Sequence, residues 1–419
     1  MKREYIPELD GFRVLMVYLV SWFHFWQQSW LTPYLGPISL DFMVRAGYML
    51  VDGTILLSAF LLTLPYTGEG ERVPKAQAFY RKRVMRIVPS FYAVTLLMLL
   101  FVVLPYHLYS SASQLGYDLF MHALMIFNWD KTTYLGSQLG GSSWTIALEM
   151  QFYLLFPLLM RCLRKKPLAT LLGMACISAY FRGWCFFAMD EFSMVVNQLL
   201  SFLDVYALGM GMALVYHPLK AWMNGKKRQW LPYAATACLI LSFYLLILML
   251  KRQAGSQGYP AIQSGQMLRR PILAMILGLM MLSLPCCVRP IRLLFANPIT
   301  HFLSVISLNY YLVHQNVAVY LRRLGIPYSM YEYPNQAGDR HWQYCYSFLA
   351  LGCSLALAVL LTYLVEKPCA RFLSWLFVKC DRKKENLRRE RAGRKSKNAN
   401  QKLDQKTAES MERNDAREG

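Results

Sequence analysis

The chain has 419 residues, of which 56% are hydrophobic and only 16% are charged. Soluble domains usually carry about 25% charged residues, so this composition excludes an ordinary soluble protein and predicts one embedded in a membrane. The formal net charge of +21 does not indicate nucleic-acid binding, because part of it lies in the segment after residue 378 and most of the rest lies in basic loops and helix ends, where cytoplasmic positive charge orients membrane proteins. The ten cysteines lack the paired spacing of metal ligands, so no metal site is expected.

Apolar runs recur along the chain and predict an all-α, polytopic integral-membrane bundle of about ten transmembrane helices. A membrane-spanning helix needs about 20 residues. The apolar segment 115–127 is too short to span comfortably, so we expect a re-entrant or interfacial helix there. The ten predicted spans cover residues 12–30, 47–66, 88–104, 144–161, 168–189, 195–216, 231–250, 271–288, 299–321 and 348–365.

The distribution of lysine and arginine decides the predicted topology. If 115–127 does not span, the basic run 161–166 and most other basic loops lie on the same side. Because positively charged loops stay in the cytoplasm, both termini are predicted to be cytoplasmic. Residues 1–378 are expected to form the membrane domain. Residues 379–419, which are polar, charged and nearly free of aromatic residues, are expected to form a disordered cytoplasmic tail.

The first span carries an arginine at its mouth and a histidine in its interior. Arg13 and His24 are eleven residues apart, about three helical turns, so they project from nearly the same face at roughly 16 Å along the axis. An ionisable residue inside a membrane span is costly and therefore indicates a functional site. The alternative is an arginine that binds lipid phosphate and a histidine that is hydrogen-bonded in the bundle.

Five titratable residues on five predicted spans fall at a similar depth, near the outer side of the membrane. They are His24, Asp52, Glu149, Asp204 and His314. Their common depth predicts a polar chamber that opens outward. The alternative is a set of separate hydrogen-bonding residues inside the bundle.

A basic cluster precedes the third predicted span. Arg83 and Arg86 are three residues apart, so both lie on one face of a helix start. The planar guanidinium group suits bidentate phosphate binding. With Arg81 beside them, the two arginines predict a phosphate site at the cytoplasmic entrance. The alternative is a basic loop that only sets topology and binds lipid.

Five short motifs occur in order along the chain. They are Leu-Asp-Gly-Phe-Arg at 9–13 followed by His24, Tyr-Arg-Lys-Arg-Val-Met-Arg-Ile-Val-Pro at 80–89, Ser-Trp-Thr-Ile-Ala-Leu-Glu-Met-Gln-Phe-Tyr-Leu at 143–154, Ser-Leu-Asn-Tyr-Tyr-Leu-Val-His at 307–314 and Val-Glu-Lys-Pro at 365–368. With these motifs the chain resembles the membrane acyltransferase-3 family over most of residues 7–375. Members of that family are integral-membrane enzymes that typically acylate cell-surface polysaccharides, peptidoglycan and related carbohydrates.

The resemblance implies that Arg13 and His24 are the family's Arg-x10-His pair and that Arg83 and Arg86 are its Arg-x-x-Arg motif. The phosphates of an acyl-coenzyme A donor would rest on these arginines and on Arg81. His24 would act as a general base on an acceptor hydroxyl, or as a nucleophile that is itself acylated. No bound cofactor is expected, because the acyl-coenzyme A is a substrate.

Other candidates have supporting roles. Glu149 is expected to orient the His24 imidazole or stabilise its charged form, with a buried interhelical hydrogen bond as the alternative. Acceptor binding or support is expected of the remaining candidates, His314, Asp52, Ser143 and Asp204. For His314 the alternative is a role in helix packing. One departure is that the family's Ser-Gly-Phe in the second helix reads Ser58-Ala59-Phe60.

The resemblance implies an O-acyltransferase that moves an acyl group, expected to be acetyl, from cytoplasmic acyl-coenzyme A to a hydroxyl of an extracytoplasmic or lipid-linked carbohydrate. It also implies a bacterial cytoplasmic membrane and contact with membrane lipids. We expect no extracytoplasmic esterase-like domain of the kind fused to some members, so that a second transfer step would need another protein or would not occur. The alternatives are a proton-coupled carrier or exporter of a polar solute and a membrane sensor that binds the donor without turnover.

Overall fold

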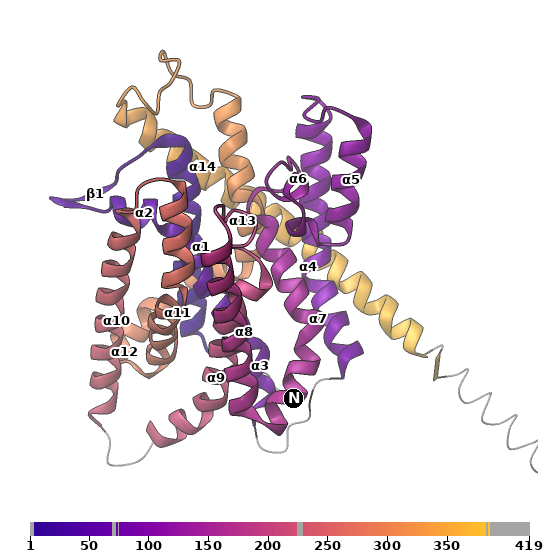
Figure 1. Cartoon of the computed structure of the whole chain (residues 1–419), viewed down its shortest axis with the longest axis vertical. Helices are drawn as coiled ribbons and strands as arrows, with labels where there is room; N and C mark the ends of the chain where they lie inside the picture. Colours follow the sequence, from indigo (N-terminus) through magenta and orange to yellow (C-terminus); the bar gives the residue numbers. More distant parts are fainter. Residues whose placement is uncertain (1–3, 69–72, 74, 224–228, 383, 386–419) are drawn as a thin grey trace, which may run out of the picture. The chain divides into compact units, whose positions relative to one another are not determined.

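The computed structural model describes residues 4–68, 73, 75–223, 229–382, 384 and 385. The chain divides after Glu366 into two compact units, which are described separately. The first unit is almost entirely helical (Figure 1). Its elements, with η for 3₁₀ or π segments, are α1 (Glu8–Ser29), β1 (Tyr34–Leu35), β2 (Ile38–Ser39), α2 (Asp41–Arg45), η1 (Gly47–Leu50), α3 (Val51–Thr63), η2 (Leu64–Tyr66), α4 (Ala76–Met98), η3 (Leu99–Val103), α5 (Ala112–Ala123), η4 (Phe127–Trp129), α6 (Lys131–Tyr134), η5 (Gly141–Ser143), α7 (Trp144–Lys165), α8 (Pro167–Ala188), α9 (Leu199–Met223), α10 (Leu231–Ala254), α11 (Tyr259–Ser283), η6 (Leu284–Cys286), α12 (Arg289–Phe295), α13 (Pro298–Arg323), α14 (Arg340–Leu360) and η7 (Leu361–Glu366).

Within the described residues, nine helical segments are long and apolar enough to cross a membrane. α1 is not among them, although it has 22 residues, because polar residues such as Asp10, Arg13 and His24 lower its hydropathy. The predicted all-α membrane bundle is confirmed. The small antiparallel hairpin of β1 and β2, in which Tyr34 pairs with Ser39, is not among the predicted elements.

The α4 and α11 helices begin well before the apolar runs that predict them. α4 begins at Ala76, so the basic residues 81–86 lie on the helix and Pro89 lies inside it. α11 begins at Tyr259 and contains Pro271, which was expected to start the span. The basic cluster, which precedes the predicted span 88–104, therefore lies within the helix itself. Hydropathy marks only the apolar part of a helix, and membrane helices tolerate internal proline when neighbouring groups satisfy the freed backbone.

The short segment predicted before the fourth span is α5, which has 12 residues. The Tyr92 hydroxyl donates a hydrogen bond to the carbonyl oxygen of Ala123 at 2.5 Å, which ties the end of α5 to α4. α6 follows it in the connection to α7. A helix of this length is too short to span a bilayer, as predicted.

Close helix packing surrounds α1, which contacts α3, α13 and α14. Gly11 faces α12: a Cβ atom at this position would stand 2.6 Å from the Cα atom of Phe295, so the glycine permits the close approach. Ala59 of α3 occupies the position of the family's glycine and faces Gly209 of α9. A Cβ atom on Gly209 would lie 2.7 Å from that of Ala59, so the small residue needed for this contact comes from α9.

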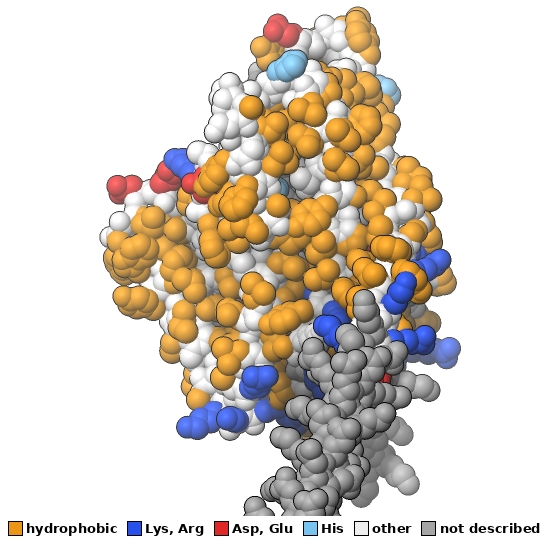
Figure 2. Space-filling model, turned by 90° about the vertical axis from the view of Figure 1, so that its right-hand side faces the viewer, with side chains coloured by type: hydrophobic (Ala, Val, Ile, Leu, Met, Phe, Trp, Pro, Cys, Tyr) orange, Lys and Arg blue, Asp and Glu red, His pale blue; other side chains and the backbone are white. Residues whose placement is uncertain are grey.

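Hydrophobic side chains cover most of the face shown in Figure 2, and lysine and arginine side chains gather toward its lower end. An apolar surface bounded by basic residues is typical of a membrane protein. In the second unit, residues 367–382 are helical. Most of the predicted tail, 379–419, and the basic run 226–228 lie outside the described residues.

Candidate active site

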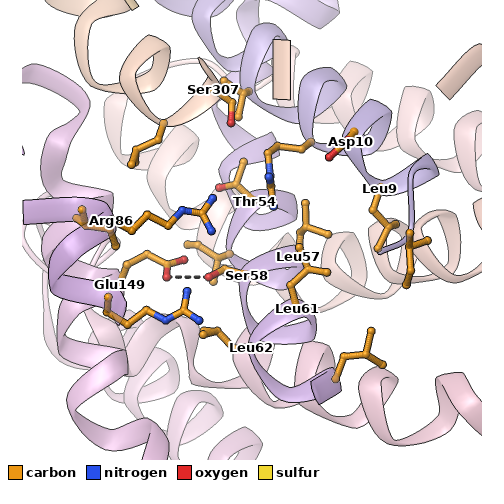
Figure 3. Close-up of a pocket in the computed structure, with 18 of the residues that line it drawn as sticks. Leu9, Asp10, Thr54, Leu57, Ser58, Leu61, Leu62, Arg86, Glu149 and Ser307 are labelled. Atoms are coloured by element: carbon orange, nitrogen blue, oxygen red, sulfur yellow. Dashed lines mark hydrogen bonds between the residues drawn. The ribbon is translucent and has the colours of Figure 1, made fainter. Parts of the chain in front are cut away.

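A cavity of about 560 Å³ lies between α1, α3, α4, α7 and α13. Figure 3 shows a largely polar side formed by groups from α4 and α7 and an apolar side formed by leucines of α3. The polar residues that line it include Asp10, Arg13, Thr54, Ser58, Arg83, Arg86, Glu149, Tyr153 and Ser307. Leu57, Leu61 and Leu62 line its apolar side. Such a cavity suits an anionic ligand that has an apolar arm.

The structure brings together three of the four predicted phosphate-binding arginines. Arg83 and Arg86 of α4 and Arg13 of α1 all line the cavity. The Arg83 guanidinium carbon lies 5.3 Å from the ring centre of Phe79 and 5.4 Å from that of Tyr153, and these aromatic rings support its position. Arg81 does not line the cavity. It lies two positions before Arg83, which corresponds to a rotation of about 200° around the helix, so its side chain projects from the opposite face.

Hydrogen bonds across two helices fix Arg13 at the cavity wall. Its Nη1 atom donates to Ser304 Oγ of α13 at 3.2 Å. Ser304 Oγ in turn donates to Asp10 Oδ1 at 2.8 Å. His301 Nδ1 lies 2.9 Å from the other oxygen of the same carboxylate. Asp10 of the Leu-Asp-Gly-Phe-Arg motif thus ties α1 to α13 and holds Arg13 in place.

Glu149 belongs to this cavity. Ser58 Oγ donates to Glu149 Oε2 at 2.8 Å (Figure 3), and Tyr153 is also hydrogen-bonded to the carboxylate. Its charged neighbours are Arg83 and Arg86. The hydrogen-bond partner of His24 is instead Gln27, at 2.8 Å from Nδ1. The sequence predicts that Glu149 orients the His24 ring, but in the structure the two side chains have different hydrogen-bond partners.

His24 lies on α1 with Arg13, as predicted, but it does not line the cavity. Its ring stands beside that of His314, with the ring centres 5.2 Å apart. Tyr311 connects the two places, because it lines the cavity and its ring centre lies 5.4 Å from that of His314. Thr145, which also lines the cavity, hydrogen-bonds the Tyr311 side chain. Tyr311 thus stands between the arginines and the two histidines.

The two aspartates of the predicted chamber form buried ion pairs elsewhere. Asp52 lies 3.3 Å from Arg270 of α11, and both side chains are almost fully buried. Asp204 lies 2.6 Å from Arg182 of α8. The two pairs adjoin, because both arginines donate to the carbonyl oxygen of Ser201. The five residues expected in one chamber therefore fall into three groups, because depth in the membrane does not determine position in its plane.

Ser143 is buried in η5 and donates to the carbonyl oxygen of Gly140 at 2.6 Å.

A buried histidine and aspartate near Ser143 form a pair that is not among the predicted site residues. His122 Nδ1 is 2.9 Å from Asp118 Oδ1, and both side chains are buried in α5. The sequence does indicate this pair, because an aspartate and a histidine four residues apart within 115–127 lie on the same face of a helix. Within the described residues, no cluster of side chains could hold a metal ion.

Comparison with known proteins identifies the family. Residues 6–364 match the family described as "Acyltransferase domain". The chain is similar to "Putative O-acetyltransferase SACOL0978" of Staphylococcus aureus (strain COL), with 24% identity over 265 residues, 59% of this chain and 41% of the relative. It is also similar to "O-acetyltransferase OatA" of Staphylococcus aureus (strain NCTC 8325 / PS 47), with 28% identity over 177 residues, 39% of this chain and 26% of the relative.

The chain thus spans less than half the length of these curated relatives. No solved structure matches it. The family match includes four of the five motifs completely, and with them the cavity arginines, Glu149 and both histidines of the pair. Because the match covers most of the sequence, the chain belongs to this acyltransferase family.

Proposed function

We propose that the protein is an O-acyltransferase that moves an acetyl group from acetyl-coenzyme A to a hydroxyl of an extracytoplasmic or lipid-linked carbohydrate. The observation that carries the proposal is the cavity in which Arg13, Arg83 and Arg86 meet beside an apolar wall. Both named relatives carry the word O-acetyltransferase in their printed names, which supports an oxygen atom as the acyl acceptor.

The cavity fits the parts of an acyl-coenzyme A. Guanidinium groups bind phosphates through paired, charge-assisted hydrogen bonds. The leucines of α3 offer an apolar surface to the long arm that carries the thioester. A volume of about 560 Å³ lies within the range of roughly 300–1,000 Å³ that small-molecule sites occupy. The thioester end would then approach Tyr311, the residue next to the histidine pair.

His24 would supply the proton transfer. The acceptor oxygen bonds to the acyl carbon while its own O–H bond breaks, and the proton passes to the unprotonated nitrogen of His24. The carbon–sulfur bond breaks, and the leaving thiolate takes that proton. In the other route His24 itself carries the acyl group between donor and acceptor. Both routes need the cavity on one side of Tyr311 and the acceptor on the other.

The proposed setting is the cytoplasmic membrane of a bacterium, with lipids around the bundle, both termini in the cytoplasm and the donor entering from that side. The arginine cavity supports this orientation, because it is lined by residues 4–6 before α1 and by the start of α4. The ion pairs of Asp52 with Arg270 and Asp204 with Arg182 weaken the carrier alternative, since a carboxylate paired with arginine is a poor member of a proton relay.

Turnover by the purified protein tests the proposal. The protein, reconstituted in lipid nanodiscs, is incubated with acetyl-coenzyme A labelled in the acetyl group and with a panel of soluble and lipid-linked carbohydrates. We expect donor binding, release of free coenzyme A and label on a carbohydrate oxygen. Solute accumulation in vesicles without donor binding would favour the carrier. Donor binding without release of coenzyme A would favour a sensor.

A further inference from the structure

Two histidine rings from different helices stand side by side in the bundle. The ring centres of His24 in α1 and His314 in α13 are 5.2 Å apart, and the ring planes are tilted by 50°. The two helices pack closely along each other. His314 is fully buried, whereas His24 is partly exposed. The partly exposed ring can therefore meet a substrate, and the buried ring can act only through its neighbour.

Hydrogen bonds determine which nitrogen of each ring carries the hydrogen. His314 Nδ1 lies 2.8 Å from the carbonyl oxygen of Tyr311, which also accepts from Ser142 Oγ at 3.0 Å. A carbonyl oxygen only accepts, so Nδ1 is the donor and Nε2 of the neutral ring keeps a lone pair. His24 Nδ1 lies 2.8 Å from the amide oxygen of Gln27, which assigns its hydrogen in the same way. Both rings thus have an unprotonated Nε2.

The Nε2 atom of His314 is buried and has no hydrogen-bond partner among the described residues. A buried polar atom without a partner is destabilising, so its presence calls for an explanation. Packing against neighbouring rings fixes the His314 ring in this position. The Tyr310 ring lies nearly parallel to the His314 ring, with centres 5.8 Å apart. Tyr310 is itself stacked on Tyr18 and hydrogen-bonded to Ser21 at 2.7 Å.

We propose that His314 is a positioning residue whose Nε2 accepts a hydrogen bond from His24 when His24 carries the proton of the acceptor. The inference rests on the proposed function. While the acyl carbon bonds to the acceptor oxygen and loses the thiolate, His24 becomes an imidazolium inside the membrane. A neutral imidazole beside it stabilises that charge without adding a second one. When the thiolate takes the proton, His314 Nε2 returns to its unpartnered state.

Two substitutions at position 314 separate this role from packing. His314→Gln keeps an oxygen that can accept a hydrogen bond from His24. His314→Phe fills the site and stacks on Tyr310 but accepts nothing. The matched control is His122→Gln, which removes another buried imidazole that has an unpartnered Nε2 and lies outside the proposed machinery. His24→Gln is the comparator for loss of the base. Folding of each variant is checked by its melting temperature in detergent.

We expect kcat to fall about tenfold in His314→Gln and about a hundredfold in His314→Phe, because one charge-assisted hydrogen bond is weakened in the first and lost in the second. Binding of coenzyme A, measured by calorimetry, should be unchanged in both, because the arginines hold it. His122→Gln should keep its kcat per folded molecule. His24→Gln should lose the roughly 10²- to 10⁴-fold typical of a missing general base.

Equal kcat losses in both His314 variants and in the His122 control would mean that position 314 serves packing, and the inference would be wrong. A weaker affinity for coenzyme A with unchanged kcat would overturn it as well, by placing His314 in donor binding. In either case transfer by the unmodified protein would leave the proposed function standing. Absence of transfer in the unmodified protein would refute the proposed function, and the role of His314 with it.

Discussion

Among the single residues of the cavity, Glu149 is a buried carboxylate beside the arginines that we propose to bind the donor phosphates. Glu149 is bound by Ser58 at 2.8 Å and has Arg83 and Arg86 as its charged neighbours. A charge in the membrane interior must be paired, so the electrostatic attraction between the carboxylate and these two arginines stabilises both charges. In the proposed complex, a donor phosphate would share the guanidinium groups with Glu149. The geometry of the guanidinium group, and not charge alone, should therefore determine affinity.

Substitution of arginine by lysine at the cavity tests this point. Arg83→Lys and Arg86→Lys retain the charge but lose the planar donor pair. We expect each to raise the Kd for coenzyme A about tenfold, which corresponds to one weakened charge-assisted hydrogen bond. Titration calorimetry measures the effect. Arg81→Lys on the same helix is the control and should bind as the unmodified protein does, because Arg81 does not line the cavity. Equal effects at positions 81 and 86 would contradict the assignment.

At the scale of the elements, much of the architecture could be predicted from the sequence. Hydropathy gives the all-α membrane bundle and the short α5 helix, because both depend only on length and apolarity. The spacing of Arg83 and Arg86 predicts their common face. Lateral neighbours could not be predicted, because which helix stands beside which depends on side-chain packing across the whole bundle. The local sequence therefore gives no signal that Asp52 pairs with Arg270 or that Glu149 lies beside the arginines of α4.

The contact of α1 with α12 depends on a glycine in the first motif. In Gly11→Ala the added Cβ would stand 2.6 Å from the Cα atom of Phe295, and no flexible side chain can yield there. We expect a loss of roughly 1–3 kcal/mol, as for other overpacked sites. The melting temperature in detergent should fall. Gly173→Ala in α8 is the matched control, because nothing lies within 4 Å of its added Cβ and alanine favours a helix. An equal change in both variants would exclude close packing as the reason for Gly11.

At the scale of the whole molecule, the proposed direction of transfer depends on which side of the membrane the cavity arginines face. The α1, α3, α4, α7 and α13 helices that enclose the cavity belong to the first unit. α7 ends in the basic residues Arg164 and Lys165, and a polar connection containing Gln336 joins α13 to α14. Because basic helix ends are retained in the cytoplasm, we expect the end of α7 to lie inside and the α13–α14 connection to lie outside.

Cysteine accessibility measures this orientation directly. In a background without the ten native cysteines, a single cysteine replaces Lys166, directly after α7, or Gln336; both positions are exposed. An impermeant maleimide added to intact cells should label Gln336→Cys and leave Lys166→Cys unlabelled until the membrane is opened. Labelling of both after lysis is the control for reactivity. Labelling of Lys166→Cys in intact cells would show that the end of α7 lies outside. The arginine cavity would then lie on the outer side, away from the cytoplasmic supply of acyl-coenzyme A, and the proposed direction of transfer would be wrong.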